Sequence, residues 1–385
     1  MLKVGRGAHA PPFLVMDVIA AANARQAVLG PAGPRVIRME VGQPGTGAPA
    51  GAVAAARAAL GGADPLGYTE ALGRASLRER IGRHYGAWYG AEVAPGRVAV
   101  TTGASGAFPL AFLAAFDPGD RVALAAPFYP PYLNILVALG ITPVVMPAVI
   151  ETRYQPTVAM LEQLDPRPDG LIVASPCNPA GTMLMPDELR AIAVWCHAHG
   201  VRLVSDEIYH GLQYERPIAT AAAYSPSAVV INSFSKYFSM TGWRVGWMVL
   251  PEDLVRPVEC LAQNFFISAP HVCQVAAEAA FGCAEELDGN VARYRRAREH
   301  LLRALPGVGF PEIAAADGAF YLYADVGART NDSVAFCARM LAEVGVAVTP
   351  GVDFDRERGA QTVRFSYCGP EADMMAAVER LRGFR

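Results

Sequence analysis

Short apolar runs alternate along the chain with longer segments that have the periodicity of helices. The short runs are rich in valine, alanine and leucine and lie at 97–101, 121–125, 170–175, 201–205 and 228–232. The helical segments between them lie at 105–115, 130–139, 186–199 and 253–261. Strands separated by crossover helices are typical of a doubly wound, mostly parallel sheet. We therefore predict an α/β fold with three layers.

The pattern changes after a long charged helix that the sequence predicts at 287–305. Beyond this helix lie a predicted strand at 319–324, a helix from Ser333, and strands at 346–349 and 362–366. We interpret this second α+β unit as a smaller domain. The expected organisation is a large domain at 43–285, a small domain at 286–385, and an N-terminal segment at 1–42 that packs with the small domain.

The composition is that of a globular protein with a sizeable core. Of the 385 residues, 52% are hydrophobic and 18% charged, which excludes disorder of the whole chain. The 33 basic and 36 acidic side chains give a net charge of −3, which provides no basic field for nucleic acid or an anionic membrane. No apolar run approaches the roughly 20 residues that span a bilayer, and residues 1–10 lack the apolar stretch of a secretory signal. We expect a soluble, cytoplasmic protein that binds neither nucleic acid nor membrane.

The cysteines indicate neither a disulfide framework nor a metal centre. There are 7 of them, an odd number, and no two have C-x-x-C spacing, which favours reduced thiols. Cys196, His197 and His199 resemble a ligand cluster, but residues two apart on a helix do not share a face. We therefore predict no metal site.

Polar residues follow three successive predicted strands. Asn178, Asp206 and Lys236 each lie just beyond the end of one of these strands. Ligands of open α/β sheets bind outside the carboxyl ends of the strands, so aligned strands bring the three side chains to one cleft. A lysine in this position is either an ordinary surface residue or a partly buried amine whose lowered pKa suits it to form a Schiff base.

A lysine, a carboxylate and an arginine around one flat ligand fit pyridoxal phosphate. Its aldehyde bonds to a lysine, its ring nitrogen is kept protonated by a carboxylate, and its phosphate takes arginine and backbone donors. Asp206 suits the ring nitrogen, Tyr209 the ring hydroxyl and Arg244 the phosphate. The segment at 101–107 predicts a strand, a glycine turn and a helix start, which suit a phosphate dianion, although a plain helix cap at Ser105 has the same pattern.

Six motifs occur in the order found in one family, the class I and II aminotransferases. The motifs are Gly67-Tyr68-Thr69, Thr102-Gly103-Ala104-Ser105-Gly106-Ala107, Asn178-Pro179-Ala180-Gly181-Thr182, Asp206-Glu207-Ile208-Tyr209, Ser233-Phe234-Ser235-Lys236 with Gly242-Trp243-Arg244, and Val363-Arg364-Phe365-Ser366. Over roughly residues 40–370 the chain resembles this family, which belongs to the aspartate aminotransferase superfamily. The resemblance implies the pyridoxal-phosphate-dependent transferase fold of type I. It also implies exchange of an amino group between an L-amino acid and a 2-oxo acid.

The resemblance also implies a role for each matching residue. Lys236 is the expected catalytic residue, which bonds to the cofactor and then moves a proton. The expected cofactor-binding residues are Gly103, Ala104, Ser105, Tyr129, Asn178, Asp206, Tyr209, Ser233, Lys236 and Arg244, with Tyr68 reaching the cofactor of a neighbouring subunit in a homodimer. Phe128 takes the place of Tyr129 if the alignment is one residue off. The expected substrate-binding residues are Gly42, Asn178 and Arg364, the last of which grips the α-carboxylate.

Two positions depart from the family pattern. Ala180 replaces a threonine in the Asn-Pro-Thr-Gly motif, but the asparagine of that motif is retained. Dicarboxylate-specific members carry a second arginine at the position of Asn264, whose amide cannot supply that charge. A neutral or apolar substrate side chain is therefore expected, unless a basic residue of another loop replaces the arginine. The apolar residues that support this expectation are Phe13, Phe265, Phe266 and Ile267.

Other functions use the same set of residues. A C–S β-lyase, or a ring-forming enzyme of the aminocyclopropane-carboxylate kind, differs only in its leaving-group chemistry at Cβ or Cγ. A ligand-sensing transcriptional regulator needs a DNA-binding domain, but the roughly 40 residues before the loop at 41–44 show no basic helix-turn-helix pattern. We therefore expect a transaminase, with the lyase as the alternative. By analogy, the segment around 11–18 closes over the cleft when substrate binds.

Overall fold

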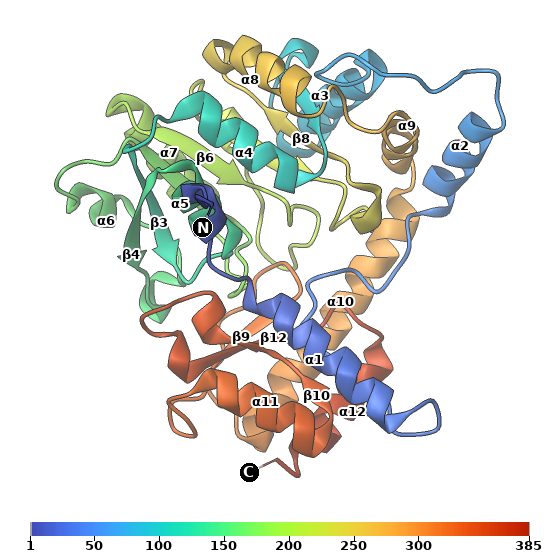
Figure 1. The fold of residues 1–385 in the computed structure, drawn as a ribbon, viewed down its shortest axis with the longest axis vertical. Helices are drawn as coiled ribbons and strands as arrows, with labels where there is room; N and C mark the ends of the chain where they lie inside the picture. Colours follow the sequence, from blue (N-terminus) through green and yellow to red (C-terminus); the bar gives the residue numbers. More distant parts are fainter. Residues whose placement is uncertain (1, 385) are drawn as a thin grey trace.

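A seven-stranded sheet forms the centre of the larger part of the molecule, in a computed structural model that describes residues 2–384 (Figure 1). The strands are β2 (Val98–Thr101), β3 (Arg121–Ala126), β4 (Thr142–Pro147), β5 (Gly170–Ala174), β6 (Arg202–Asp206), β7 (Val229–Ser233) and β8 (Gly246–Val249). Their spatial order is β2-β8-β7-β6-β5-β3-β4. The pairs β2–β8 and β8–β7 are antiparallel, and the other neighbouring pairs of this sheet are parallel, so β8 runs opposite to the other six strands. The prediction of a mostly parallel sheet is confirmed.

Both faces of this sheet are covered, because successive strand residues face opposite sides. Val122 and Leu124 belong to one buried apolar cluster, whereas Ala123 and Ala125 belong to another. The first cluster includes residues of α4 (Ala104–Ala115), α5 (Pro131–Leu139) and α8 (Glu252–Phe265). The second includes residues of α2 (Ala50–Leu60), α3 (Ala75–Tyr89), α6 (Val158–Glu162), α7 (Pro186–Ala198) and α9 (His271–Ala280). The two clusters and the sheet between them give the three predicted layers.

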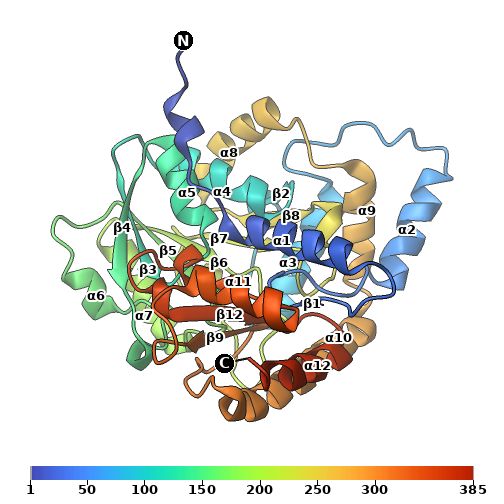
Figure 2. The same cartoon turned by 60° about the horizontal axis from the view of Figure 1, so that its bottom comes forward.

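The second part of the molecule is built on a small antiparallel sheet with the order β11-β12-β9. Its strands are β9 (Tyr321–Asp325), β11 (Thr349–Pro350) and β12 (Thr362–Ser366), and β1 (Ile37–Arg38) pairs separately with β10 (Val346–Ala347). The helices of this part are α1 (Leu14–Leu29), α10 (Ala284–Ala304), α11 (Ser333–Val344) and α12 (Glu371–Leu381). Figure 2 shows α1 lying along this part beside α11, in agreement with their contacts.

Short 3₁₀ helices lie between the α-helices and strands of the described residues. They are η1 (Arg6–His9), η2 (Pro95–Arg97), η3 (Ile150–Thr152), η4 (Ala221–Ala223), η5 (Thr241–Trp243), η6 (Leu305–Val308), η7 (Gly351–Asp353) and η8 (Gly359–Gln361). The N-terminal segment contacts both parts of the molecule, because η1 packs on α5 while α1 packs on β11 and α11. The expected domain limit at 285 falls inside the continuous helix α10, and the three domain ranges stay predictions. Within residues 2–384, no helix has both the length and the apolar character to cross a membrane.

Candidate active site

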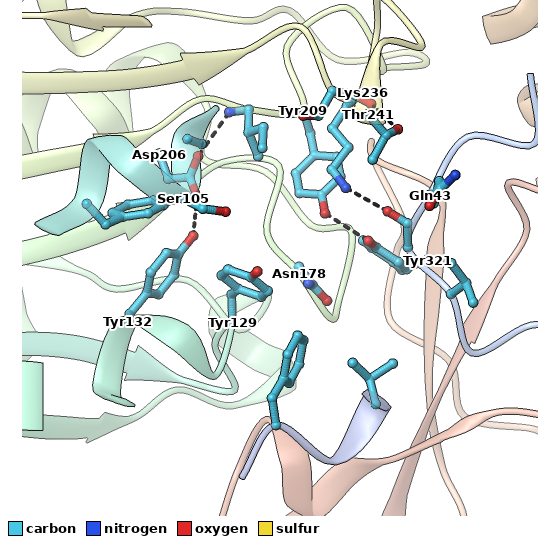
Figure 3. A pocket seen from close by; sticks show the side chains of 18 of the residues that line it. Gln43, Ser105, Tyr129, Tyr132, Asn178, Asp206, Tyr209, Lys236, Thr241 and Tyr321 are labelled. Atoms are coloured by element: carbon cyan, nitrogen blue, oxygen red, sulfur yellow. Dashed lines mark hydrogen bonds between the residues drawn. The ribbon is translucent and has the colours of Figure 1, made fainter. Parts of the chain in front are cut away.

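A cavity of about 250 Å³ lies at the carboxyl ends of the parallel strands, between the large sheet and the small one (Figure 3). Segments that follow β2, β3, β5, β6 and β7 all contribute to its lining, as do α1, β9 and β12. This is the position at which open α/β sheets bind their ligands. The predicted site residues that line the cavity are Gly42, Ala104, Ser105, Tyr129, Asn178, Asp206, Tyr209, Lys236, Arg244 and Arg364.

Lys236 projects into the cavity from the loop that follows β7. Its Nζ donates a hydrogen bond to the carbonyl oxygen of Gly42 at 2.6 Å and lies 5.6 Å from the centre of the Tyr209 ring. Burial lowers the pKa of Lys236 to about 8, because an ammonium group loses hydration in this cavity. A substantial fraction of the side chain is therefore neutral near pH 8, and a neutral amine can act as a nucleophile or as a base.

Asp206 ends β6 and points into the cavity from another side (Figure 3). Its carboxylate accepts hydrogen bonds from the Tyr132 hydroxyl and from the backbone N–H of Ile208, the latter at 3.1 Å. Burial raises the pKa of Asp206 to about 6, although both hydrogen bonds favour the ionised form. The site can therefore present a buried negative charge at neutral pH, which suits a cationic N–H group of a ligand.

An anion cradle is formed where α4 begins. Gly103, the residue before the helix, has a φ of 73°, and an ideal Cβ added there lies 2.4 Å from Nη2 of Arg244. A glycine at this position therefore lets the Arg244 guanidinium lie across the first turn of α4, where Nη2 donates to the Ser105 hydroxyl at 3.4 Å. Free backbone N–H groups, a hydroxyl and a guanidinium together suit a phosphate dianion.

Arg364 is a buried cation at the centre of the small sheet. Its Nη1 donates to Asn178 Oδ1 at 2.8 Å, and its Nη2 donates to Thr349 Oγ1 at 3.1 Å. The guanidinium lies 4.5 Å from the ring centre of Tyr321 and 4.7 Å from that of Phe354. No carboxylate of residues 2–384 forms an ion pair with it, and its Nε has no hydrogen-bond partner there. A buried charge without a counter-ion is costly, so the arrangement favours a ligand carboxylate.

Three expected residues lie outside the lining of this cavity. Gly103 lies just before the lining residue Ala104 and acts through the space it leaves for Arg244. Ser233 is buried, and its hydroxyl donates to the carbonyl oxygen of Val245 at 3.1 Å instead of facing the cavity. Ser235, two residues later, lines the cavity in its place. Tyr68 is 82% exposed, as a residue that reaches a neighbouring subunit would be in an isolated chain.

Other lining residues were not identified from the sequence. The Tyr132 hydroxyl bonds to Asp206, and its ring lies 5.4 Å from that of Tyr129, which precedes α5 by two residues. Its closeness to Tyr129 in the sequence is the signal that could have indicated it. The hydroxyl of Tyr321 lies 2.8 Å from the hydroxyl of Tyr209. The contact joins β9 to the turn after β6, and residues 112 positions apart carry no local pattern that predicts it. Further lining residues that the sequence did not identify include Gln43, Ser235 and Thr241.

Comparison with known proteins places these observations in a family. Residues 34–381 match the model of the family "Aminotransferase class I and II". A valine–pyruvate aminotransferase of Mycobacterium tuberculosis is 50% identical over 383 residues, which cover 98% of this chain and 97% of that protein. The crystal structure of an aminotransferase from the same organism is 49% identical, has a TM-score of 0.97, and is matched over 100% of this chain and 99% of its own. An aspartate aminotransferase from Thermus thermophilus, solved with maleate, is 29% identical with a TM-score of 0.91 over 100% of both chains.

Proposed function

This chain belongs to the class I and II aminotransferases and is an aminotransferase, and we propose that it uses pyridoxal phosphate to exchange an amino group between an apolar L-amino acid and a 2-oxo acid. The observation that carries this proposal is the arrangement of three groups in one cavity. Lys236 supplies an amine with a lowered pKa, Asp206 a buried carboxylate, and Arg364 a buried cation that forms no ion pair with a carboxylate of residues 2–384.

The donor set of the cavity fits pyridoxal phosphate. The cradle of Ala104, Ser105 and Arg244 would hold the phosphate. The absence of a side chain at Gly103 leaves the space that the Arg244 guanidinium occupies in this cradle. Asp206 would hold the ring nitrogen, and Tyr209 would donate its hydroxyl proton to the ring hydroxyl oxygen. When bound, the cofactor supplies an aldehyde that condenses with amines and a cationic ring that accepts the electron pair released at the substrate Cα. The side chains of Tyr129 and Asn178 would complete the pocket.

The residues of the chain supply the proton transfer and the orientation of the substrate. Nζ of Lys236 would take the proton from the substrate Cα and deliver it to the carbon that was the cofactor's aldehyde carbon, on the other side of the substrate nitrogen. The low pKa of this amine matters, because an amine that is neutral near pH 8 can accept a proton there. The Asp206 carboxylate would keep the ring nitrogen of the bound cofactor protonated. Arg364 binds the α-carboxylate and so sets which bond of Cα faces Lys236.

Apolar side chains around the cavity support an apolar substrate. Phe13, Val15 and Ile19 line it from the N-terminal segment, and Phe108 and Ile208 line it from the large domain. None of these five can pair with a second carboxylate. The name of the relative that is 50% identical specifies valine and pyruvate, which agrees with a small apolar amino donor and a short 2-oxo acid.

We also propose a homodimer in the cytoplasm. Tyr68 and the segment at 265–267 expose large apolar side chains, with Phe265 54% and Ile267 47% exposed. Surfaces of this kind are typical of interfaces, and the family resemblance places Tyr68 at a partner's active site. The seven cysteines are free, which agrees with a reducing compartment.

A single-turnover titration tests the proposed function. The holoenzyme is mixed with one amino acid at a time, without any oxo acid, and the cofactor's visible absorption is followed. We expect valine and other apolar amino acids to remove the absorption band and to yield one equivalent of the matching 2-oxo acid, whereas aspartate reacts far more slowly. Persistence of the band with continuous release of pyruvate and ammonia, or of a thiol, would instead establish the alternative C–S lyase.

Replacement of Arg364 should affect only substrates that carry an α-carboxylate. Two charge-assisted hydrogen bonds are lost in Arg364→Ala, and Arg364→Lys keeps the charge without the planar fork. We expect kcat/KM for valine to fall about 100- to 1,000-fold in the alanine variant and less in the lysine variant. The control substrate is isobutylamine, which is valine without its carboxylate, and its slow reaction should change little. An equal loss for both substrates would contradict this role of Arg364.

A further inference from the structure

The N-terminal end of α1 is held by a carboxylate from a distant part of the chain. Asp353, in η7, accepts hydrogen bonds from the backbone N–H groups of Leu14 at 2.9 Å and Val15 at 3.1 Å, one on each carboxylate oxygen. These are the first two residues of the helix, and Phe13 before them provides no side-chain cap. A carboxylate at a helix N-terminus is stabilised by the free N–H groups and by the helix dipole. Asp353 therefore does for α1 what a local capping residue usually does.

A second contact ties down the chain just before α1. The carbonyl oxygen of Pro11 accepts a hydrogen bond from Nδ2 of Asn134, on α5 of the large domain, at 3.3 Å. Oδ1 of Asn134 in turn accepts from Arg356 at 3.1 Å, which fixes the orientation of the amide. Phe13 thus lies between two anchors, one on the large domain and one on the small domain. We call the segment from 11 to 15 the strap.

The strap forms one wall of the cavity. The side chains of Phe13 and Val15 line it, and the Phe13 ring meets the Tyr129 ring edge-on, with 5.7 Å between the centres and 86° between the planes. Asp353 itself does not line the cavity and is 7% exposed, so it touches neither substrate nor cofactor. Within residues 2–384 its carboxylate forms no ion pair, and the two strap N–H groups are its hydrogen-bond donors.

We propose that Asp353 is a positioning residue that sets the side-chain selectivity of the enzyme by holding the strap against the cavity. With both N–H groups bound, Phe13 and Val15 are fixed in contact distance of the substrate side chain. Without these two hydrogen bonds, Phe13 and Val15 move away from the cavity. A branched apolar side chain of the substrate then loses more contacts than a methyl group does. The proposal rests on the proposed transamination of apolar amino acids and adds a residue that selects among them.

The test compares three variants of the holoenzyme. Asp353→Ala removes both hydrogen bonds, whereas Asp353→Asn keeps one acceptor oxygen and a similar shape. The chain also offers a matched control, because Asp332 caps α11 with bonds from Val334 N–H at 3.1 Å and Ala335 N–H at 3.0 Å. Asp332→Ala therefore removes the same kind of helix cap from the same domain, away from the cavity.

The first readout is the ratio of kcat/KM for valine to kcat/KM for alanine. One methylene in an apolar pocket changes the discrimination between two substrates by roughly 10- to 200-fold. Because valine is larger than alanine by two carbons, displacement of Phe13 and Val15 should remove at least part of the discrimination between them. We expect the ratio to fall about tenfold in Asp353→Ala, mainly through KM for valine, and about threefold in Asp353→Asn. In Asp332→Ala the ratio should stay at the wild-type value. An unchanged ratio in both Asp353 variants would overturn the proposal.

The second readout does not depend on turnover. Amide hydrogen exchange of the peptide that spans 11–19 should be faster in Asp353→Ala and unchanged in Asp332→Ala. Equal exchange in the wild type and in Asp353→Ala would also overturn the proposal. Failure of the proposed function is distinguishable, because it appears in the wild-type protein as an absence of reaction with either amino acid. The Asp353→Asn variant keeps the test decisive if the alanine variant does not fold.

Discussion

We expect Lys236→Ala to lower the rate of transamination by at least about four orders of magnitude. General acid–base catalysis by a positioned side chain contributes roughly 10²- to 10⁴-fold, and in the proposed function this lysine also supplies the amine that bonds to the cofactor. No other amine of residues 2–384 lines the cavity. The measurement is the single-turnover rate with valine at saturating cofactor. Retention of more than about one hundredth of the wild-type rate would refute the assignment of the base.

The control for this prediction is unusually clean, because the chain contains two lysines, Lys3 and Lys236. Lys3→Ala should leave the rate unchanged. Borohydride reduction of the holoenzyme, followed by peptide mapping, should locate the cofactor on the peptide that carries Lys236.

The burial that lowers the pKa of Lys236 to about 8 also predicts a pH dependence. Capture of added cofactor by the cofactor-free protein should accelerate as the pH rises toward about 8, where the neutral amine begins to predominate, and level off above it.

We expect Asp206→Asn to lower the rate about 1,000-fold while the protein stays folded. The substitution keeps the shape of the side chain and removes its charge, so in the proposed function the ring nitrogen would lose the group that keeps it protonated. Loss of one preorganised electrostatic contact at a reacting centre typically costs about 10²- to 10³-fold. The measurement is again the single-turnover rate with valine, together with the thermal midpoint of unfolding. A rate within tenfold of the wild type would contradict this role.

Tyr132→Phe separates the charge of Asp206 from its hydrogen bond. The variant removes the donated hydrogen bond and leaves the carboxylate, so its rate should fall less than about tenfold.

The pKa of Asp206 gives a further check, because burial raises it to about 6 and the cationic ring of the proposed cofactor needs the ionised carboxylate. Cofactor affinity of the wild-type protein should therefore decline as the pH falls through about 6. In Asp206→Asn this part of the pH dependence should be lost.

The elements that the sequence predicted are those with a strong local pattern. The strands at β2, β3, β5, β6 and β7 were expected because they are buried apolar runs between helices. The edge strand β4 was not, because Pro143 and Pro147 interrupt it and half of its side chains face outward. The helix at 105–115 starts one residue earlier than expected, since the glycine turn at Gly103 precedes it directly.

The sequence by itself determined where the two side chains with the proposed reactive roles lie. Asp206 and Lys236 follow strands whose carboxyl ends must meet at one edge of a parallel sheet, so local periodicity and motif order were enough to bring them together. Their environment was decided by the tertiary structure. Whether Arg364 has a counter-ion, and which serine faces the cavity, depend on residues from other elements.

The strap shows this division most clearly. Asp353 and Leu14 are separated by 339 positions, and the hydrogen bond between them leaves no periodic pattern in the chain. In the sequence, Asp353 cannot be told apart from other polar loop residues, because its contact with the start of α1 exists only in the folded chain. Local patterns record which face of an element is buried, whereas a contact between distant elements depends on how those elements pack. For that reason the sequence alone was enough to predict that Asp206 and Lys236 share one cavity, and only the tertiary structure decided what surrounds them.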